Sequence, residues 1–158
     1  MDYKVVEIPG RKLIGYSIEM SLVENKTNEI WKKFMPRLKE ITNAKSADLY
    51  SLQVYPNNYY LEFSPFTTFT KWAAIEVKDF ENIPENFEQF KLPTGKYAVF
   101  LHKGNTEQFV QTAQYIYEEW LPKSGYKLDD RPHFELLGDK YLGHENPDSE
   151  EEIWVPIK

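Results

Sequence analysis

Cysteine is absent from the 158 residues, which excludes disulfide bonds and thiolate metal sites. No apolar stretch approaches the roughly 20 residues that a helix needs to cross a bilayer. The first residues, MDYKVVEIPG, lack the apolar run of a signal peptide. These absences make a cytoplasmic protein the default expectation, and they argue against a membrane partner.

Positive charge is also scarce, since 19 Lys and Arg residues stand against 25 Asp and Glu residues and leave a net charge of -6. That balance opposes attraction to phosphate backbones, so we expect no direct binding of nucleic acid. The three histidines include no pair at metal-ligand spacing, and the chain has neither a Gly-rich phosphate loop nor a G-x-S-x-G motif. We therefore expect no metal, no cofactor and no catalytic site of a familiar sequence type.

The chain does contain an internal repeat. The segment IPGRK at 8–12 returns as LPTGK at 92–96, an offset of 84, and IWKKFMP at 30–36 returns as IYEEWLP at 116–122, an offset of 86. Two similar offsets indicate one domain, 1–158, in which residues 1–78 correspond to residues 87–158. Small-molecule pockets form preferentially where two such halves meet. Because the aromatic content of 16% exceeds what a core of this size needs, we expect some rings to face a ligand.

Local patterns predict strand, helix, strand, strand in each half. One helix is predicted at 27–43, with a kink or break at Pro36, and a second runs from a capping box at Asn105 to a stop at Pro122. The turn at Pro9-Gly10 predicts a hairpin or near-hairpin between the first two strands. Strands are predicted at 3–8, 13–20, 49–55, 69–77, 87–92, 97–102, 133–137 and 151–157.

These elements predict an α+β fold of two pseudo-symmetric modules, in which each helix covers one face of a largely antiparallel sheet. Alternation along the strands puts Phe134 and Ile153, with their alternating neighbours, under the helices, where Trp31 and Trp120 are also expected to pack. The opposite face then holds the candidate ligand-binding residues, which are Glu135, Leu137, Glu152, Trp154, Tyr97 and Trp72.

Glu135 is the strongest of these candidates. It lies among Phe134, Leu136 and Leu137, with no lysine or arginine within three positions. A buried carboxylate in that setting suffers a desolvation penalty that a cationic ligand relieves, and each surrounding ring adds about 0.5 to 2 kcal/mol of cation–π attraction. The same burial would raise the pKa of the carboxyl group, which a general base also needs, so the site chemistry permits both binding and catalysis.

Six segments are distinctive in their order and spacing: SLQVY at 51–55, FTKWAAIEV at 69–77, LPTGKYA at 92–98, WLP at 120–122, HFE at 133–135 and EIWVPI at 152–157. Together they resemble the GyrI-like family, which includes the effector-binding domains of bacterial multidrug-sensing transcription activators. The resemblance implies two strand-helix-strand-strand modules with an aromatic-lined pocket at their seam. It also implies a pocket glutamate at Glu135 beside Leu137, a second acid and an aromatic at Glu152 and Trp154, and a pocket tyrosine at Tyr97.

The activators in that family carry a helix-turn-helix module before this domain, whereas this chain begins at the first strand. We therefore expect a free-standing effector-binding or sequestering protein for lipophilic cationic or aromatic molecules. Hydrolysis of strained electrophilic toxins with Glu135 as base is the first alternative. Inhibition of a protein such as DNA gyrase is the second, with the acidic run 148–152 as its surface feature. Binding ranks first because no motif supplies a positioned nucleophile.

Overall fold

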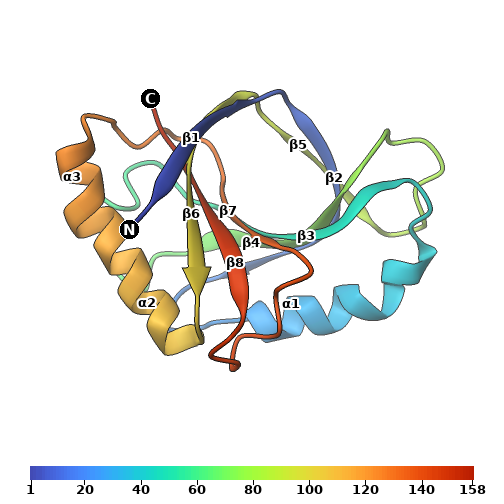
Figure 1. Cartoon of the computed structure of the whole chain (residues 1–158). Coiled ribbons are helices and arrows are strands. Elements are labelled where there is room, and N and C mark those ends of the chain that lie inside the picture. The colour runs from blue at the N-terminus through green and yellow to red at the C-terminus, as the bar shows by residue number, and fades with distance from the viewer.

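The structure is a computed structural model that describes residues 1–158. The protein is built on one eight-stranded antiparallel sheet (Figure 1). The strands are β1 (Tyr3–Ile8), β2 (Arg11–Met20), β3 (Ala44–Val54), β4 (Phe69–Val77), β5 (Glu88–Leu92), β6 (Gly95–Lys103), β7 (His133–Leu137) and β8 (Glu150–Pro156). Their order across the sheet is β1-β6-β8-β7-β3-β4-β2-β5. The predicted α+β fold is confirmed.

The strand order is symmetric about the central β3–β7 pair. Replacing each strand by its counterpart four places along the chain reproduces the same order in reverse. The duplication that would explain this symmetry stays a prediction. The predicted hairpin at Pro9-Gly10 is wrong, because β1 pairs with β6 and β2 pairs with β4 and β5. The first strand of each half therefore pairs with the second strand of the other half.

Both helical segments lie against the same face of the sheet. The first consists of α1 (Thr27–Phe34) and the 3-10 helix η1 (Met35–Glu40). The second consists of α2 (Thr106–Gln114), the π-helical turn η2 (Tyr115–Trp120) and α3 (Leu121–Ser124). The break predicted at Pro36 is confirmed by the change to 3-10 geometry. The predicted stop at Pro122 is wrong, because the helix continues and ends before Gly125, which has a φ of 80°.

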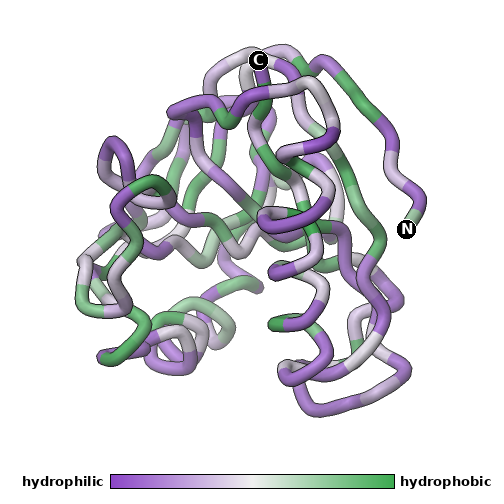
Figure 2. Tube along the Cα trace, turned by 90° about the vertical axis from the view of Figure 1, so that its left-hand side faces the viewer, coloured by the Kyte–Doolittle hydropathy of each residue, from purple (hydrophilic) through white to green (hydrophobic).

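Both faces of the sheet are buried. On the helix face, one core forms against α1, including Phe34 and Ala73, and another forms against α2 and η2, including Trp120 and Ile153. In Figure 2 hydrophobic residues occur along the central part of the trace, interspersed with hydrophilic ones. The opposite face holds a third core, whose buried members are Ile8, Leu13, Tyr50, Leu52, Trp72, Ala74, Leu92, Tyr97, Val99, Phe134 and Trp154.

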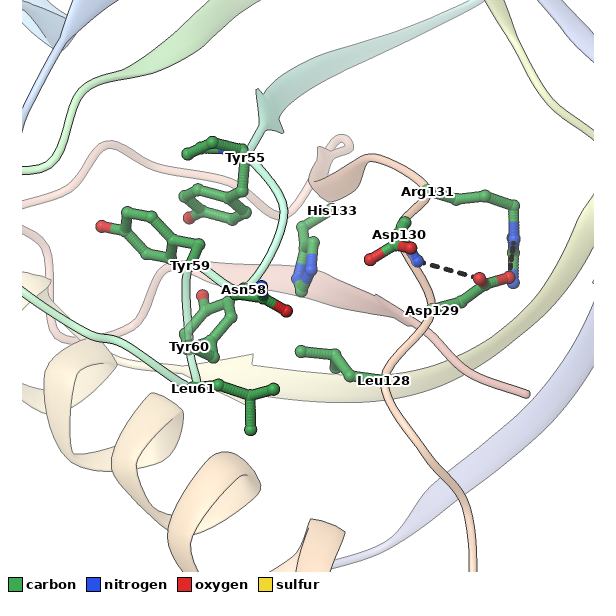
Figure 3. Close-up of a pocket in the computed structure, with 11 residues that line it drawn as sticks. Tyr55, Asn58, Tyr59, Tyr60, Leu61, Leu128, Asp129, Asp130, Arg131 and His133 are labelled. Carbon is green, nitrogen blue, oxygen red and sulfur yellow. Dashed lines mark hydrogen bonds and ion pairs between the residues drawn. The ribbon is translucent and has the colours of Figure 1, made fainter.

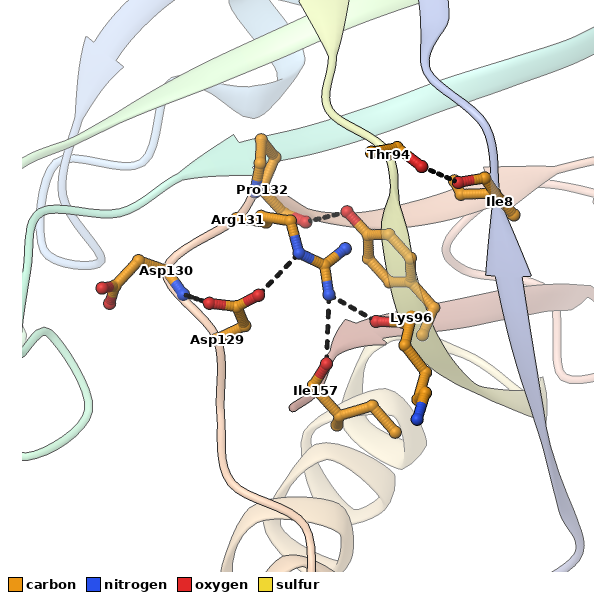
Figure 4. A network of polar contacts seen from close by, with 9 residues as sticks. Ile8, Thr94, Lys96, Asp129, Asp130, Arg131, Pro132 and Ile157 are labelled. Atoms are coloured by element: carbon orange, nitrogen blue, oxygen red, sulfur yellow. Dashed lines mark hydrogen bonds and ion pairs between the residues drawn. The ribbon is translucent and has the colours of Figure 1, made fainter.

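The third core exists because the sheet is rolled. Ile8 in β1 and Leu92 in β5 belong to strands at opposite edges of the sheet, yet they share this core. The end of β1 also meets the turn after β5, since Thr94 Oγ1 donates a hydrogen bond to the carbonyl oxygen of Ile8 at 2.8 Å (Figure 4). The rolled sheet thus fills its concave face with its own side chains and needs no helix there. A glycine inside β2, Gly15, is required because a Cβ there would overlap the carbonyl oxygen of Ala73.

Candidate functional site

Glu135 stands on the helix-covered face, at the centre of the sheet. Glu135 is in β7, where it lies opposite Ser51 of β3 and opposite Ile153 of β8. Ser51 in turn lies opposite Ala73 of β4. Residues opposite each other in antiparallel strands share a face of the sheet. Because Ile153 packs in the α2 core and Ala73 in the α1 core, Glu135 lies between the two cores and between the two helices.

A buried set of polar side chains surrounds Glu135. The amide Nε2 of Gln53 donates a hydrogen bond to Glu135 Oε1 at 3.1 Å, and Lys71 Nζ donates to Ser51 Oγ at 2.7 Å. Gln53, Lys71 and Ser51 are only 6%, 5% and 7% exposed. Burial raises the pKa of Glu135, and the positive charge of Lys71 and the bond from Gln53 oppose that rise. Burial likewise lowers the pKa of Lys71. Around Glu135, this face of the sheet therefore carries one lysine and several hydrogen-bonding side chains.

A second carboxylate lies close to Glu135. Burial, followed by repulsion from Glu135, raises the pKa of Glu151 to about 7, while Lys71 opposes the shift. Glu151 is partly buried in β8, opposite His102 of β6, and so shares the helix-covered face. The site thus combines two partly buried carboxylates with one buried ammonium group.

Four tyrosines gather near the Glu135 carboxylate, and we call them the tyrosine cage: Tyr55, Tyr60, Tyr117 and Tyr141. Burial raises the pKa of every cage hydroxyl, and the negative charge of Glu135 adds to each rise. The rings of Tyr60 and Tyr117 stack with centroids 4.3 Å apart, and Tyr55 meets Tyr60 edge to face at 5.4 Å. The cage residues remain neutral at ordinary pH and present aromatic faces and dipoles.

His133 anchors the cage. Its Nδ1 atom shares a hydrogen bond with the hydroxyl of Tyr117 at 2.8 Å, and its ring meets Tyr55 edge to face at 5.0 Å. Burial, and then the charge of Arg131, lowers the pKa of His133 to about 3, so the imidazole is neutral. Tyr117 belongs to the π-helical turn η2, a form that is frequent at functional sites.

A cavity of about 100 Å³ opens beside the cage (Figure 3). Tyr55, Tyr60 and His133 form one side of it, and the segment 128–131 forms the other. Arg131 fastens that segment to the sheet: its Nε donates to Asp129 Oδ2 at 2.7 Å, and its Nη2 donates to the carbonyl oxygen of Ile157 at 3.1 Å (Figure 4). The cavity is smaller than a drug-sized molecule, so a large ligand must displace cage side chains.

The structure divides the residues predicted from the sequence between the two faces. Glu135 and Leu137 are on the helix face, whereas Trp72, Tyr97 and Trp154 are in the core of the concave face. Glu152 shares the concave face and accepts a hydrogen bond from Trp154 Nε1 at 3.2 Å.

The prediction that Glu135 and Trp154 share a face is therefore wrong. Phe134, not Glu135, lies opposite Trp154, and it stacks on the indole with centroids 5.0 Å apart. Tyr97 does not reach Glu135 either, because its hydroxyl donates to the carbonyl oxygen of Pro132 at 2.7 Å. The expectation that Trp120 packs under a helix is confirmed, and Trp31 packs partly buried against the α1 core.

Lys71, Gln53, Glu151 and the tyrosine cage were missed by reasoning from the sequence. The strands that carry Lys71 and Gln53 were predicted, but no local pattern joins residues 53, 71 and 135. The high aromatic content was the available signal for the cage, and it gave no positions.

Comparison with known proteins covers the whole chain. The family described as GyrI-like small molecule binding domain matches residues 1–158. The chain belongs to this family. The resemblance inferred from its six segments is confirmed. No helix of this GyrI-like domain is both long and apolar enough to cross a membrane.

Individual relatives include a regulator, an inhibitor and a ligand complex. The GyrI-like domain is 27% identical over 158 residues to the transcriptional regulator BrlR of Pseudomonas aeruginosa, covering 99% of this chain and 56% of that protein. It is 34% identical over 84 residues to a DNA gyrase inhibitor of Erwinia billingiae, covering 50% of this chain and 51% of the inhibitor. The chain spans about half the length of these curated relatives. The structure of SAV2435 bound to tetraphenylphosphonium has the same fold, with a TM-score of 0.77 at 17% identity over 100% of this chain and 94% of that one.

Proposed function

We propose that this domain binds lipophilic monovalent cations, with Glu135 as the counter-charge and the tyrosine cage as the surrounding wall. The observation that carries the proposal is a carboxylate near four tyrosine hydroxyls that is hydrogen-bonded by Gln53 and not ion-paired with Lys71. The carboxylate keeps acceptor capacity for a ligand, because Gln53 is its one hydrogen-bonding partner among the side chains. The protein acts as an effector-binding or sequestering domain in this reading.

The energetics favour a cation over a neutral or anionic ligand. Desolvation destabilises the charged form of Glu135, as the raised pKa records, and a positive ligand removes part of that cost. Each aromatic face can add about 0.5 to 2 kcal/mol of cation–π attraction. An anion would meet two partly buried carboxylates on the same face. The ligand's charge, rather than its detailed shape, is the feature that the site selects.

The relatives support this proposal in their own terms. SAV2435, which shares the fold, has been solved in complex with tetraphenylphosphonium, a lipophilic monocation. The description of the family also names small-molecule binding.

The proposal is tested by titration calorimetry with a pair of ions of nearly equal shape. Tetraphenylphosphonium and tetraphenylborate both present four phenyl rings but carry opposite charges. We expect the phosphonium to bind with a measurable heat and the borate to show none. Equal affinity for both ions would mean that the aromatic wall alone attracts them, and cation recognition by Glu135 would be refuted.

Hydrolysis is a second candidate, favoured by the paired carboxylates. The raised pKa of Glu135 and the pKa of about 7 at Glu151 suit a base and an acid acting near neutral pH. Strained electrophiles of the cyclopropane-bearing kind are the substrates to try. Incubation with such compounds, followed by mass spectrometry, distinguishes many turnovers per protein molecule from simple binding.

A further inference from the structure

Lys71 and Glu135 lie on either side of strand β3, and each is held by a different residue of that strand. β3 runs between β4, which carries Lys71, and β7, which carries Glu135. Ser51 accepts the hydrogen bond of the Lys71 ammonium at 2.7 Å, and Gln53 donates to the Glu135 carboxylate at 3.1 Å. The two opposite charges share one buried face without forming an ion pair.

This arrangement has a consequence for any cation that enters. A lysine side chain is long and flexible enough to approach a carboxylate across one intervening strand, where neighbouring strands are about 4.8 Å apart. Bound to Ser51 instead, the ammonium leaves the Glu135 carboxylate accessible to a ligand. It still adds one fixed positive charge to a site with two carboxylates, Glu135 and Glu151. When both carboxylates are ionised, one further positive charge is enough to balance the site.

We propose that Lys71 is an internal counter-cation that limits the site to ligands of one positive charge, and that Ser51 restrains it from pairing with Glu135. The inference rests on the proposed cation binding at Glu135 and adds the charge class of the ligand. Lys71 repels the ligand's cation, and a second ligand charge would exceed the capacity of the two carboxylates. Ser51 acts as a positioning residue, because it contacts Lys71 rather than the ligand.

Two planar cations of similar size separate ligand charge from ligand shape. N-methyl-4-phenylpyridinium carries one positive charge, and N,N′-dimethyl-4,4′-bipyridinium carries two. By titration calorimetry, we expect the parent protein to bind the monocation and to bind the dication at least tenfold more weakly. Lys71→Met keeps the length of the side chain and removes its charge. It should tighten monocation binding by roughly 10- to 50-fold, the scale of one like-charge repulsion across a partly screened interior, and it should remove the discrimination against the dication.

Ser51→Ala tests the restraint independently and also serves if Lys71→Met does not fold. Without the Ser51 hydroxyl, Lys71 should pair with Glu135, and monocation binding should weaken about tenfold. The double variant with Lys71→Met should bind as Lys71→Met does, because no ammonium remains to be restrained. Lys78→Met, which removes an exposed charge just after β4, should bind as the parent does.

The outcomes separate the two proposals. Parent binding of the monocation with no tighter binding by Lys71→Met, and with unchanged binding by Ser51→Ala, overturns the role of Lys71 and leaves cation binding standing. Monocation binding by neither the parent nor Lys71→Met overturns the proposed function itself and the inference with it.

Discussion

Replacing Glu135 by glutamine removes the charge of the proposed counter-ion and keeps its shape. The new amide oxygen can still accept the hydrogen bond from Gln53 Nε2, which now reaches Glu135 at 3.1 Å. A charge-assisted contact in a poorly solvated site is worth on the order of 1.5 to 3 kcal/mol. We therefore expect Glu135→Gln to weaken tetraphenylphosphonium binding roughly 10- to 100-fold.

The same substitution should leave the fold intact. Burial raises the pKa of Glu135, so the folded protein binds more protons than the unfolded chain between the unfolded and the folded pKa. Stability therefore falls as pH rises through that window and stays lower above it. Glu135→Gln abolishes this contribution, and the variant should be at least as stable as the parent at neutral pH, with Glu151 remaining as a counter-charge for Lys71.

The assay pairs calorimetric titration with thermal unfolding followed by circular dichroism. Glu152→Gln is the matched control, because Glu152 lies on the concave face and its contact is with Trp154 Nε1. Only Glu135→Gln should lose affinity. If Glu135→Gln binds the phosphonium as the parent does, or if Glu152→Gln shows the larger loss, the assignment of the site to the helix face is refuted.

Three further predictions concern stability. The pKa of Glu151 is raised to about 7, so the parent should lose stability as pH rises from about 4.5 to 7. In urea unfolding at pH 5 and pH 8, Glu151→Gln should remove about 1 to 2 kcal/mol of that loss. Identical pH slopes for the parent and the variant would contradict this. Tyr117→Phe should cost about 1 to 3 kcal/mol in the same measurement, because buried His133 loses its Nδ1 partner; no change would mean that water replaces the hydroxyl. Gly15→Ala should cost about 3 kcal/mol or prevent folding, because its Cβ would overlap the carbonyl oxygen of Ala73. Wild-type stability would argue against so close an approach of β2 and β4 at this position.

Much of the local structure was determined by the sequence alone. The strands at Tyr3–Ile8, Phe69–Val77 and His133–Leu137 have the predicted boundaries, because turn residues and alternation mark both of their ends. The capping box of Asn105 and Gln108 is present with both of its hydrogen bonds. These features depend on residues near each other in the chain, so a single sequence contains the information that specifies them.

Glu135 as the candidate counter-charge could also be proposed from the sequence, because an acidic residue amid apolar neighbours is a local signal. The side chains that surround Glu135 could not be predicted in the same way. Alternation with a period of two says which residues share a face of one strand, but it does not say which face the helices cover. When both faces of a sheet are apolar, as they are here, both assignments fit the pattern equally well.

Tertiary structure decided between those assignments. Rolling the sheet gives the concave face a core of its own, and that core takes Trp72, Tyr97 and Trp154 away from Glu135. The cage comes instead from the segment after β3, from the turn η2 and from the loop before β8, which the pairing of β7 between β3 and β8 brings together. Lys71 reaches the site only through the β3–β4 pairing. These contacts join residues that lie far apart in the chain, and the closing of the sheet, rather than any local preference, determines which of them meet.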